Sequence, residues 1–114
     1  MRGRYILLDG QPVPCDNVLE WAQWFETSDE TRRIERTQIA EGVEVSTVFM
    51  GLDHSFGEGP PLLYETMVFG GRLDEETERY STVKHALEGH DQMVKRVRAA
   101  MGEPESDILE GPIG

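Results

Sequence analysis

The sequence contains one cysteine, two lysines and no long hydrophobic run, and each shortage argues against a class of protein. A single thiol, Cys15, cannot form a disulfide within the chain or supply a zinc-binding Cys-x-x-Cys pair, so a reducing, cytoplasmic setting fits best. No run of apolar residues is long enough for a transmembrane helix, and the apolar patch in MRGRYILLDG is too short for a signal peptide. We therefore expect a cytoplasmic protein with no membrane partner.

Positive charge is also scarce. The chain has 11 Lys and Arg residues against 22 Asp and Glu residues, which gives a net charge of −11. A surface of this charge repels nucleic-acid phosphates and anionic lipids, so direct binding of nucleic acid is not expected. It suits a basic protein surface, including one that normally holds DNA, although acidity can also serve only to keep a protein soluble.

The length suits a single domain over residues 1–102, followed by an acidic tail over residues 103–114 that contains proline and glycine. We expect that tail to be flexible. Early in the domain, the turn Asp9-Gly10 separates two β-rich runs, and Asp16 is suited to cap a helix with one apolar face. The predicted elements are strands over residues 4–8 and 11–14, a helix over 17–26 and a polar loop over 27–31.

The clearest local signal is the turn Glu41-Gly42, which predicts a hairpin between the strands on either side. A two-residue loop pairs the flanking residues in step, so Ala40 would lie opposite Val43 and Arg36 opposite Thr47. The three long strands are predicted over residues 33–40, 43–51 and 62–69.

A second helix is predicted from a cap at Ser81 or Thr82 to about Met101, after an acidic linker over residues 74–78. Its apolar stripe includes Val83, Leu87, His90, Val94 and Val97. Together the elements predict an α+β fold in the order ββ-α-β-β-β-α, with an antiparallel sheet of about four or five strands and two helices packed on one face. The other face of the sheet would be solvated or buried in an interface.

Residues 51–61 form a glycine- and proline-rich loop that is longer than a connection between two strands requires. The glycines do not match a phosphate-binding pattern, and two acids within the loop would repel phosphate. We expect Phe56 to plug the loop onto the core, and the loop to present a surface or to form the wall of a pocket.

Glu65 stands out because both faces of the strand over residues 62–69 are largely apolar. Alternation puts Glu65 on one face with Met67 and Phe69, and Tyr64 on the other. A carboxylate among large apolar side chains is costly unless it is paired. Two interpretations stay open: a structural pairing with Arg36, Arg33 or His90, or a pKa-shifted acid or metal ligand acting with Asp53, His54 and Glu58.

The remaining candidates for chemistry carry weaker signals. His85 and His90 are five residues apart, which turns them away from each other on a helix and does not suit a zinc pair. His90 lies in the apolar stripe, where we expect a core histidine with hydrogen-bonded ring nitrogens. No histidine base is evident for Cys15, which we expect to be a small buried thiol. The sequence therefore predicts no catalytic residue and no metal or other cofactor.

One stretch carries a resemblance. The segment TVFMGLDHSFGEGPPLLYETMVFGG, followed by ERYST and ALEGHDQMVKRV, resembles a group of small proteins encoded by bacteriophages and prophages. The likeness covers roughly residues 5–100 and is most specific in residues 47–71. It implies an accessory protein that acts inside an infected bacterium, and it carries no established activity or catalytic residue. The excess of arginine over lysine would suit a GC-rich host.

Three functions stay open. The first is a non-enzymatic protein that binds a host protein, for instance as an inhibitor of an enzyme or a defence complex. The second is an oligomeric binder that sequesters a small molecule in a pocket at the 51–61 loop, and the third is a metal-dependent hydrolase that uses Asp53, His54 and Glu65. The candidate residues for binding a partner or ligand are Asp53, His54, Phe56, Glu58, Tyr64 and Glu65.

We also expect self-association. The strand over residues 62–69 is apolar on both faces, and two helices in a chain of this length cover only one face of the sheet. An exposed apolar sheet face favours a partner, and a dimer with two-fold symmetry through that face or a sheet edge would cover it.

Overall fold

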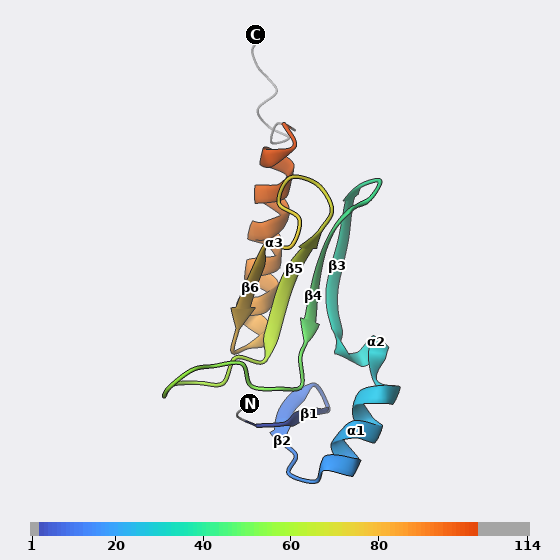
Figure 1. The fold of residues 1–114 in the computed structure, drawn as a ribbon, viewed down its shortest axis with the longest axis vertical. Helices are drawn as coiled ribbons and strands as arrows, with labels where there is room; N and C mark the ends of the chain where they lie inside the picture. The colour runs from blue at the N-terminus through green and yellow to red at the C-terminus, as the bar shows by residue number, and fades with distance from the viewer. Residues whose placement is uncertain (1–2, 103–114) are drawn as a thin grey trace.

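The computed structural model describes residues 3–102, and the predicted α+β class is confirmed (Figure 1). The predicted tail over residues 103–114 lies outside the described residues. The elements are β1 (Tyr5–Leu8), β2 (Gln11–Pro14), α1 (Val18–Thr27), α2 (Asp29–Arg32), β3 (Arg33–Ala40), β4 (Val43–Phe49), β5 (Tyr64–Phe69), β6 (Thr77–Tyr80) and α3 (Val83–Ala100).

The centre of the fold is an antiparallel meander of four strands, in the order β3-β4-β5-β6. Helix α3 lies across one face of this sheet and contacts all four strands. The strands β1 and β2 do not join it and form a separate hairpin. The prediction that two helices share one sheet face is therefore wrong: in the described part of the chain α3 alone covers the face, and α1 packs beside β1 at the end of the sheet.

Helix α1 is held to the rest of the molecule by its tryptophans. The indole Nε1–H of Trp21 donates to the carbonyl oxygens of Tyr5 and Gly51, each at 3.1 Å. Trp24 meets the ring of Phe49 edge-on, with 6.0 Å between the ring centroids. The N-cap is Asn17 and not Asp16, since the Asn17 side chain accepts the backbone N–H of Glu20.

Two predicted irregular segments are in fact regular. Part of the predicted linker over residues 74–78 is the start of β6, and the predicted loop over 27–31 contains the short helix α2. The pattern of β6, Thr-Glu-Arg-Tyr, hides the strand because its two central residues are charged, and the strand is stabilised by pairing with β5. A short edge strand with charged residues is a common way to limit unwanted strand pairing.

The β3–β4 hairpin forms around Gly42 as predicted, but its register changes along the strands. Ala40 pairs with Val43, and a bulge between Gln38 and Ala40 then shifts the pairing by one residue. Arg36 lies opposite Ser46 and not opposite Thr47. Because a shift of one residue exchanges the two faces of a strand, Thr37 faces α3 and Arg36 faces away from it. Arg36 there forms an ion pair with Glu44 at 3.1 Å.

The core between α3 and the sheet has two apolar clusters with a polar layer between them. One cluster lies at the end of the sheet near β1 and the other lies near the β3–β4 turn. The helix contributes Ala86, His90, Met93 and Val97, while Val83 and Leu87 are more than two-fifths exposed, so the predicted apolar stripe is only partly right. The fully buried strand residues on the helix side are Val45, Thr47, Phe49, Tyr64, Thr66 and Val68.

The polar layer is built around His90, which is only 1 % exposed. Its Nε2 is 2.8 Å from the Thr37 hydroxyl on β3, and its Nδ1 is 2.8 Å from the Thr47 hydroxyl on β4. The Thr47 hydroxyl also bonds the Thr66 hydroxyl on β5. The expectation of a core histidine with both ring nitrogens bonded is confirmed. Burial lowers the pKa of His90 below its ordinary value of 6.5, while Glu35 and Asp91 oppose that shift.

The face of the sheet opposite α3 is not covered by any other element within residues 3–102 (Figure 1). Glu65 lies on this face as alternation predicted, but its partner is Arg79 on β6, at 3.0 Å, and none of the three predicted partners. Phe69 on the same face is about half exposed. Self-association through this face stays a prediction.

The buried neutral His90 makes the stability of the protein depend on pH. As pH falls through 6.5, the unfolded chain takes up a proton at His90 before the folded chain does. The stabilisation that neutral His90 contributes to the folded state is therefore present above pH 6.5 and is lost below it. We expect His90→Leu to be less stable than the wild type by about 1–3 kcal/mol near pH 7.5, because threonine hydroxyls lose their partner. We expect this gap to narrow toward about pH 5.

Urea unfolding at several pH values measures this gap. The exposed His85 provides the control, since His85→Gln should follow the wild-type curve. A gap between the wild type and His90→Leu that stays constant with pH would contradict the assignment of a neutral buried His90.

Candidate functional site

The structure distributes the six predicted site residues over three places and does not join them in one site. Asp53, His54, Phe56 and Glu58 belong to the loop between β4 and β5. Tyr64 is a core residue that meets Phe49 edge-on at 5.3 Å, and burial raises the pKa of its hydroxyl. Glu65 lies on the uncovered face of the sheet. Within residues 3–102, no three His, Cys, Asp or Glu side chains are grouped to hold a metal ion.

Asp53 closes the base of the β4–β5 loop. Its side chain is 8 % exposed, and its Oδ1 accepts the backbone N–H of Ser55 at 2.8 Å and of Leu62 at 3.0 Å. The backbone N–H of His54 also donates to the Leu62 carbonyl, at 3.1 Å. These bonds join the two ends of the loop, so Asp53 has a structural role, and it is not aimed into a cleft with His54 and Glu65.

The closed loop projects from the molecule (Figure 1). Phe56 at its tip is 92 % exposed, so the prediction that this ring plugs the loop onto the core is wrong. The clamp at Asp53 fixes the base of the loop and holds the segment after it away from the sheet. Glu58 and Pro60 in the same segment are also exposed.

The clamp can be tested with a pair of matched substitutions. Asp53→Ala leaves two backbone donors without their acceptor and should destabilise the protein by about 1–3 kcal/mol. Asp53→Asn keeps a carbonyl oxygen at the same place, so it should cost less. Thermal unfolding measures both effects, and hydrogen exchange should show faster exchange of the Ser55 and Leu62 amides in Asp53→Ala. Unchanged exchange at these two amides would contradict the clamp.

A second group of exposed apolar side chains lies on α1 and the adjoining hairpin. The sequence predicts a buried face with Val18, Trp21, Ala22 and Phe25, yet α1 has no buried residue at all. Val18 is 55 % exposed and Leu19 is 76 % exposed, and Leu8 at the end of β1 is 54 % exposed. Trp21, Trp24 and Phe25 are only half-buried. We call the end of the molecule that carries Leu8, Val18, Leu19 and Phe56 the apolar end, where the loop with Phe56 and helix α1 lie on opposite sides of the β1–β2 hairpin (Figure 1).

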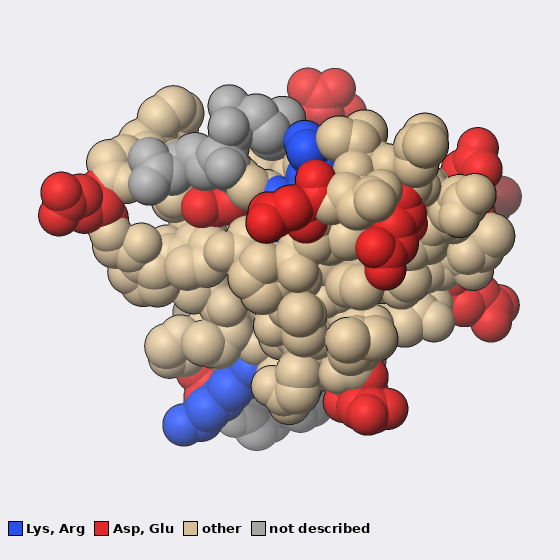
Figure 2. All heavy atoms as spheres, turned by 90° about the horizontal axis from the view of Figure 1, so that it is seen from below, with Lys and Arg blue, Asp and Glu red and all other residues tan. Residues whose placement is uncertain are grey.

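The apolar end has an acidic surround. Residues 3–32 contain six acids and two arginines. One of these, Arg32, is engaged locally, with its guanidinium 3.7 Å from the centroid of the Phe25 ring and an ion pair to Asp29 at 3.1 Å. Figure 2 looks onto this end of the molecule and shows uncharged residues across its middle, with acidic side chains above them and around the margin.

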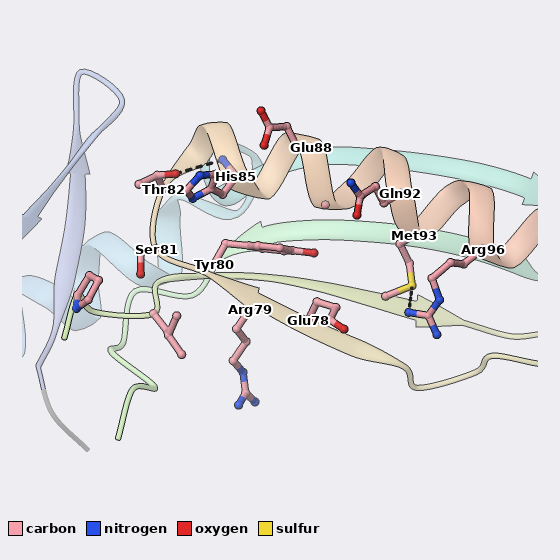
Figure 3. Close-up of a pocket in the computed structure, with 13 residues that line it drawn as sticks. Glu78, Arg79, Tyr80, Ser81, Thr82, His85, Glu88, Gln92, Met93 and Arg96 are labelled. Carbon is pink, nitrogen blue, oxygen red and sulfur yellow. Dashed lines mark hydrogen bonds between the residues drawn. The ribbon is translucent and has the colours of Figure 1, made fainter. Parts of the chain in front are cut away.

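The third feature is a groove of about 700 Å³ between β6 and α3 (Figure 3). The ring of Tyr80 extends from β6 beneath the helix, and Met93 points from α3 toward the sheet. Pro60 and Leu62 line the groove as well, so the β4–β5 loop contributes to it, and a ligand pocket at residues 51–61 stays a prediction. No sequence pattern predicts this groove, because the charged residues of β6 hide the strand that forms one of its walls.

A helical glycine makes room for the Tyr80 ring. A Cβ atom at Gly89 would come within 2.0 Å of the Tyr80 hydroxyl oxygen and 2.2 Å of the adjoining ring carbon. Burial raises the pKa of Tyr80, with the Glu78 carboxylate acting in the same direction and the Thr66 hydroxyl in the opposite one. Gly89 therefore has a packing role, which explains a residue that otherwise weakens a helix.

Because Gly89 packs against the Tyr80 ring, a substitution that normally stabilises a helix should here destabilise the protein. In an open helix Gly→Ala stabilises by about 1 kcal/mol, whereas Gly89→Ala should destabilise by about 1–3 kcal/mol because the new methyl group overlaps the tyrosine ring. In a Tyr80→Ala background the same change should be neutral or stabilising. Chemical unfolding of the four proteins in this cycle measures the coupling, and additive effects would contradict the proposed contact.

Among the described residues, the arginines that line the groove are in ion pairs, whereas two of its glutamates are not. Arg96 forms an ion pair with Glu76 at 3.1 Å, and Arg79 turns away from the groove toward Glu65. Glu78 and Glu88 also line the groove, and within the described chain neither is in an ion pair with lysine or arginine. The groove therefore offers acidic groups to a ligand, while its arginines are engaged by the protein itself.

No protein family model, no curated protein and no solved structure matches this chain. Within residues 3–102, no helix combines the length and the apolar character needed to cross a membrane. The surfaces described above are therefore the ground for inferring a function.

Proposed function

We propose that the protein acts by binding another protein through the apolar end. The observation that supports this most strongly is the exposure of four large apolar side chains, each more than half exposed, on a chain with a net charge of −11. Phe56 in particular is almost fully exposed on a loop whose base is clamped. An ordered loop that presents an aromatic ring to solvent suits a contact residue better than a packing residue.

The energetics favour a partner for these side chains. Burying a Val, Leu or Phe side chain is worth about 1.5–3 kcal/mol, and here the fold leaves that free energy unused. Exposed apolar patches with polar margins are typical of protein-binding surfaces. Aromatic anchors often dominate the binding energy, and Phe56 and the half-buried Trp21 and Trp24 are of that kind.

The acidic surround indicates the chemistry of the partner. Six acids against two arginines in residues 3–32 would attract a surface with basic residues around an apolar patch. Charge of this kind speeds association and disfavours acidic partners more than it adds affinity. The resemblance to phage-encoded proteins is the reason to expect such a partner among the proteins of a bacterial host, where binding would inhibit an enzyme or a defence complex.

Site-specific photocrosslinking tests this proposal. A photoreactive phenylalanine analogue is placed at Leu19, at Phe56 and, as a control, at the exposed Lys95 on α3, and each protein is illuminated in a lysate of a bacterium with a GC-rich genome. We expect the same protein to be crosslinked from positions 19 and 56 and not from position 95. Crosslinking should weaken as salt is raised, because the surround is charged.

A matched pair of double variants shows whether capture of the partner depends on the apolar end. Leu19→Glu with Phe56→Glu should lower capture by at least about tenfold without changing the melting temperature, since both residues are exposed. Val83→Glu with Leu87→Glu introduces the same charge at two other exposed apolar residues and should leave capture unchanged. Equal capture by both double variants, or equal crosslinking from position 95, would refute the proposal.

A further inference from the structure

We infer that the groove between β6 and α3 binds an extended peptide that adds a fifth strand to the edge of the sheet and carries a basic side chain. This inference goes beyond the proposed function and is independent of the apolar end, because Leu8, Val18, Leu19 and Phe56 do not line the groove. It depends on three features of the described chain: a free sheet edge, a groove beside it and unpaired acids within the groove.

The free edge follows from the order and register of the strands. Within residues 3–102 the sheet ends at β6, so one side of this strand has no neighbouring strand in the described part of the chain. The carbonyl of Glu76 accepts the N–H of Val68, and the carbonyl of Tyr80 accepts the N–H of Leu63. Backbone groups in an antiparallel pair alternate in direction, so the N–H and C=O groups of Thr77 and Arg79 point away from β5. These groups can form the ladder of an added strand.

The groove lies on the helix side of this edge. An added strand would alternate its side chains, sending every second one toward α3 and the others toward the uncovered face. Those that face α3 would meet Tyr80, Met93 and Leu62. The absence of a side chain at Gly89 lets the Tyr80 ring lie against the helix, which keeps this wall of the groove flat. A groove between an edge strand and a helix suits recognition by strand addition.

The charge of the groove selects a basic peptide. Glu78 faces the helix side of the sheet, since it pairs across from the buried Thr66. A residue of the added strand beside Glu78 would share that face, and Glu88 lines the same groove from α3. Lysine or arginine at that position can pair with the Glu78 carboxylate, because the arginines of the groove are already bonded to Glu65 and Glu76.

The same edge disfavours a second copy of this chain. Two copies of β6 can pair about a two-fold axis in three registers that use the outward groups of Thr77 and Arg79. These registers set Glu78 opposite Glu78, Glu78 opposite Glu76, or Arg79 opposite Arg79 of the other copy. Like charges directly opposite in an antiparallel pair are destabilising. The edge therefore favours a different chain, with a basic residue where this chain has an acid.

Selection from a displayed library of random heptapeptides tests the inference on the full chain. We expect enriched peptides to have no internal proline and to carry lysine or arginine at one fixed position. The synthetic peptide that is most enriched, labelled for fluorescence anisotropy, should bind Glu78→Lys at least about tenfold more weakly than the wild type. The matched control Glu41→Lys makes the same charge change at the exposed β3–β4 turn and should bind as the wild type does.

Backbone methylation of the same peptide separates strand addition from other modes of binding. Methylating one alternate set of amides should abolish binding, and methylating the other set should leave it within about threefold, because only one set faces β6. Equal loss from both sets, no enrichment of basic residues, or equal binding to Glu78→Lys would overturn the inference. The variant Leu19→Glu with Phe56→Glu should bind the peptide normally. A result against peptide binding in the groove can therefore be told apart from a result against partner binding at the apolar end.

Discussion

Two hydrogen bonds of the buried His90 hold α3 to the sheet. One imidazole connects α3 to threonine hydroxyls on β3 and β4, and the Thr47 hydroxyl extends the connection to β5. Apolar side chains on either side of this layer exclude water, so each polar group must find its partner within the core. Thr37 reaches His90 only because the bulge in the β3–β4 hairpin shifts the register by one residue. The layer thus ties the orientation of α3 to the pairing of the strands.

With α3 fixed in this way, the surfaces of the molecule follow. Among residues 3–102, one helix covers one face of a four-stranded sheet and no element covers the other face, where ion pairs from Arg36 and Arg79 make it compatible with water. The position of α3 beside the short strand β6 creates the groove. At the end of the sheet, α1 is attached mainly through its tryptophans and keeps its aliphatic residues exposed. The molecule therefore combines a small core with exposed surfaces that do not contribute to the packing of that core.

Features that depend on residues close together in the chain could be predicted without the structure. The Asp9-Gly10 and Glu41-Gly42 turns, the caps of the helices within one residue, the long helix ending before Gly102 and the α+β class could all be predicted. Turn geometry, capping and helical periodicity are local, so their signals survive in a single sequence. Alternation likewise predicted that Glu65 and Tyr64 lie on opposite faces of β5, and the apolar stripe predicted a buried His90.

Contacts between residues far apart in the chain could not be predicted in the same way. The bulge in β3 is favoured by the contact between Thr37 and His90, which are 53 residues apart, and no local pattern carries that information. Strand β6 has charged central residues and is stabilised by β5, including the pair of Arg79 with Glu65. The hydrogen bonds of Asp53 join the two ends of the β4–β5 loop, in which Phe56 is exposed although an aromatic residue in a loop predicts burial. In each case a long-range hydrogen bond or ion pair outweighs the local preference, and such partners become known only once the chain has folded.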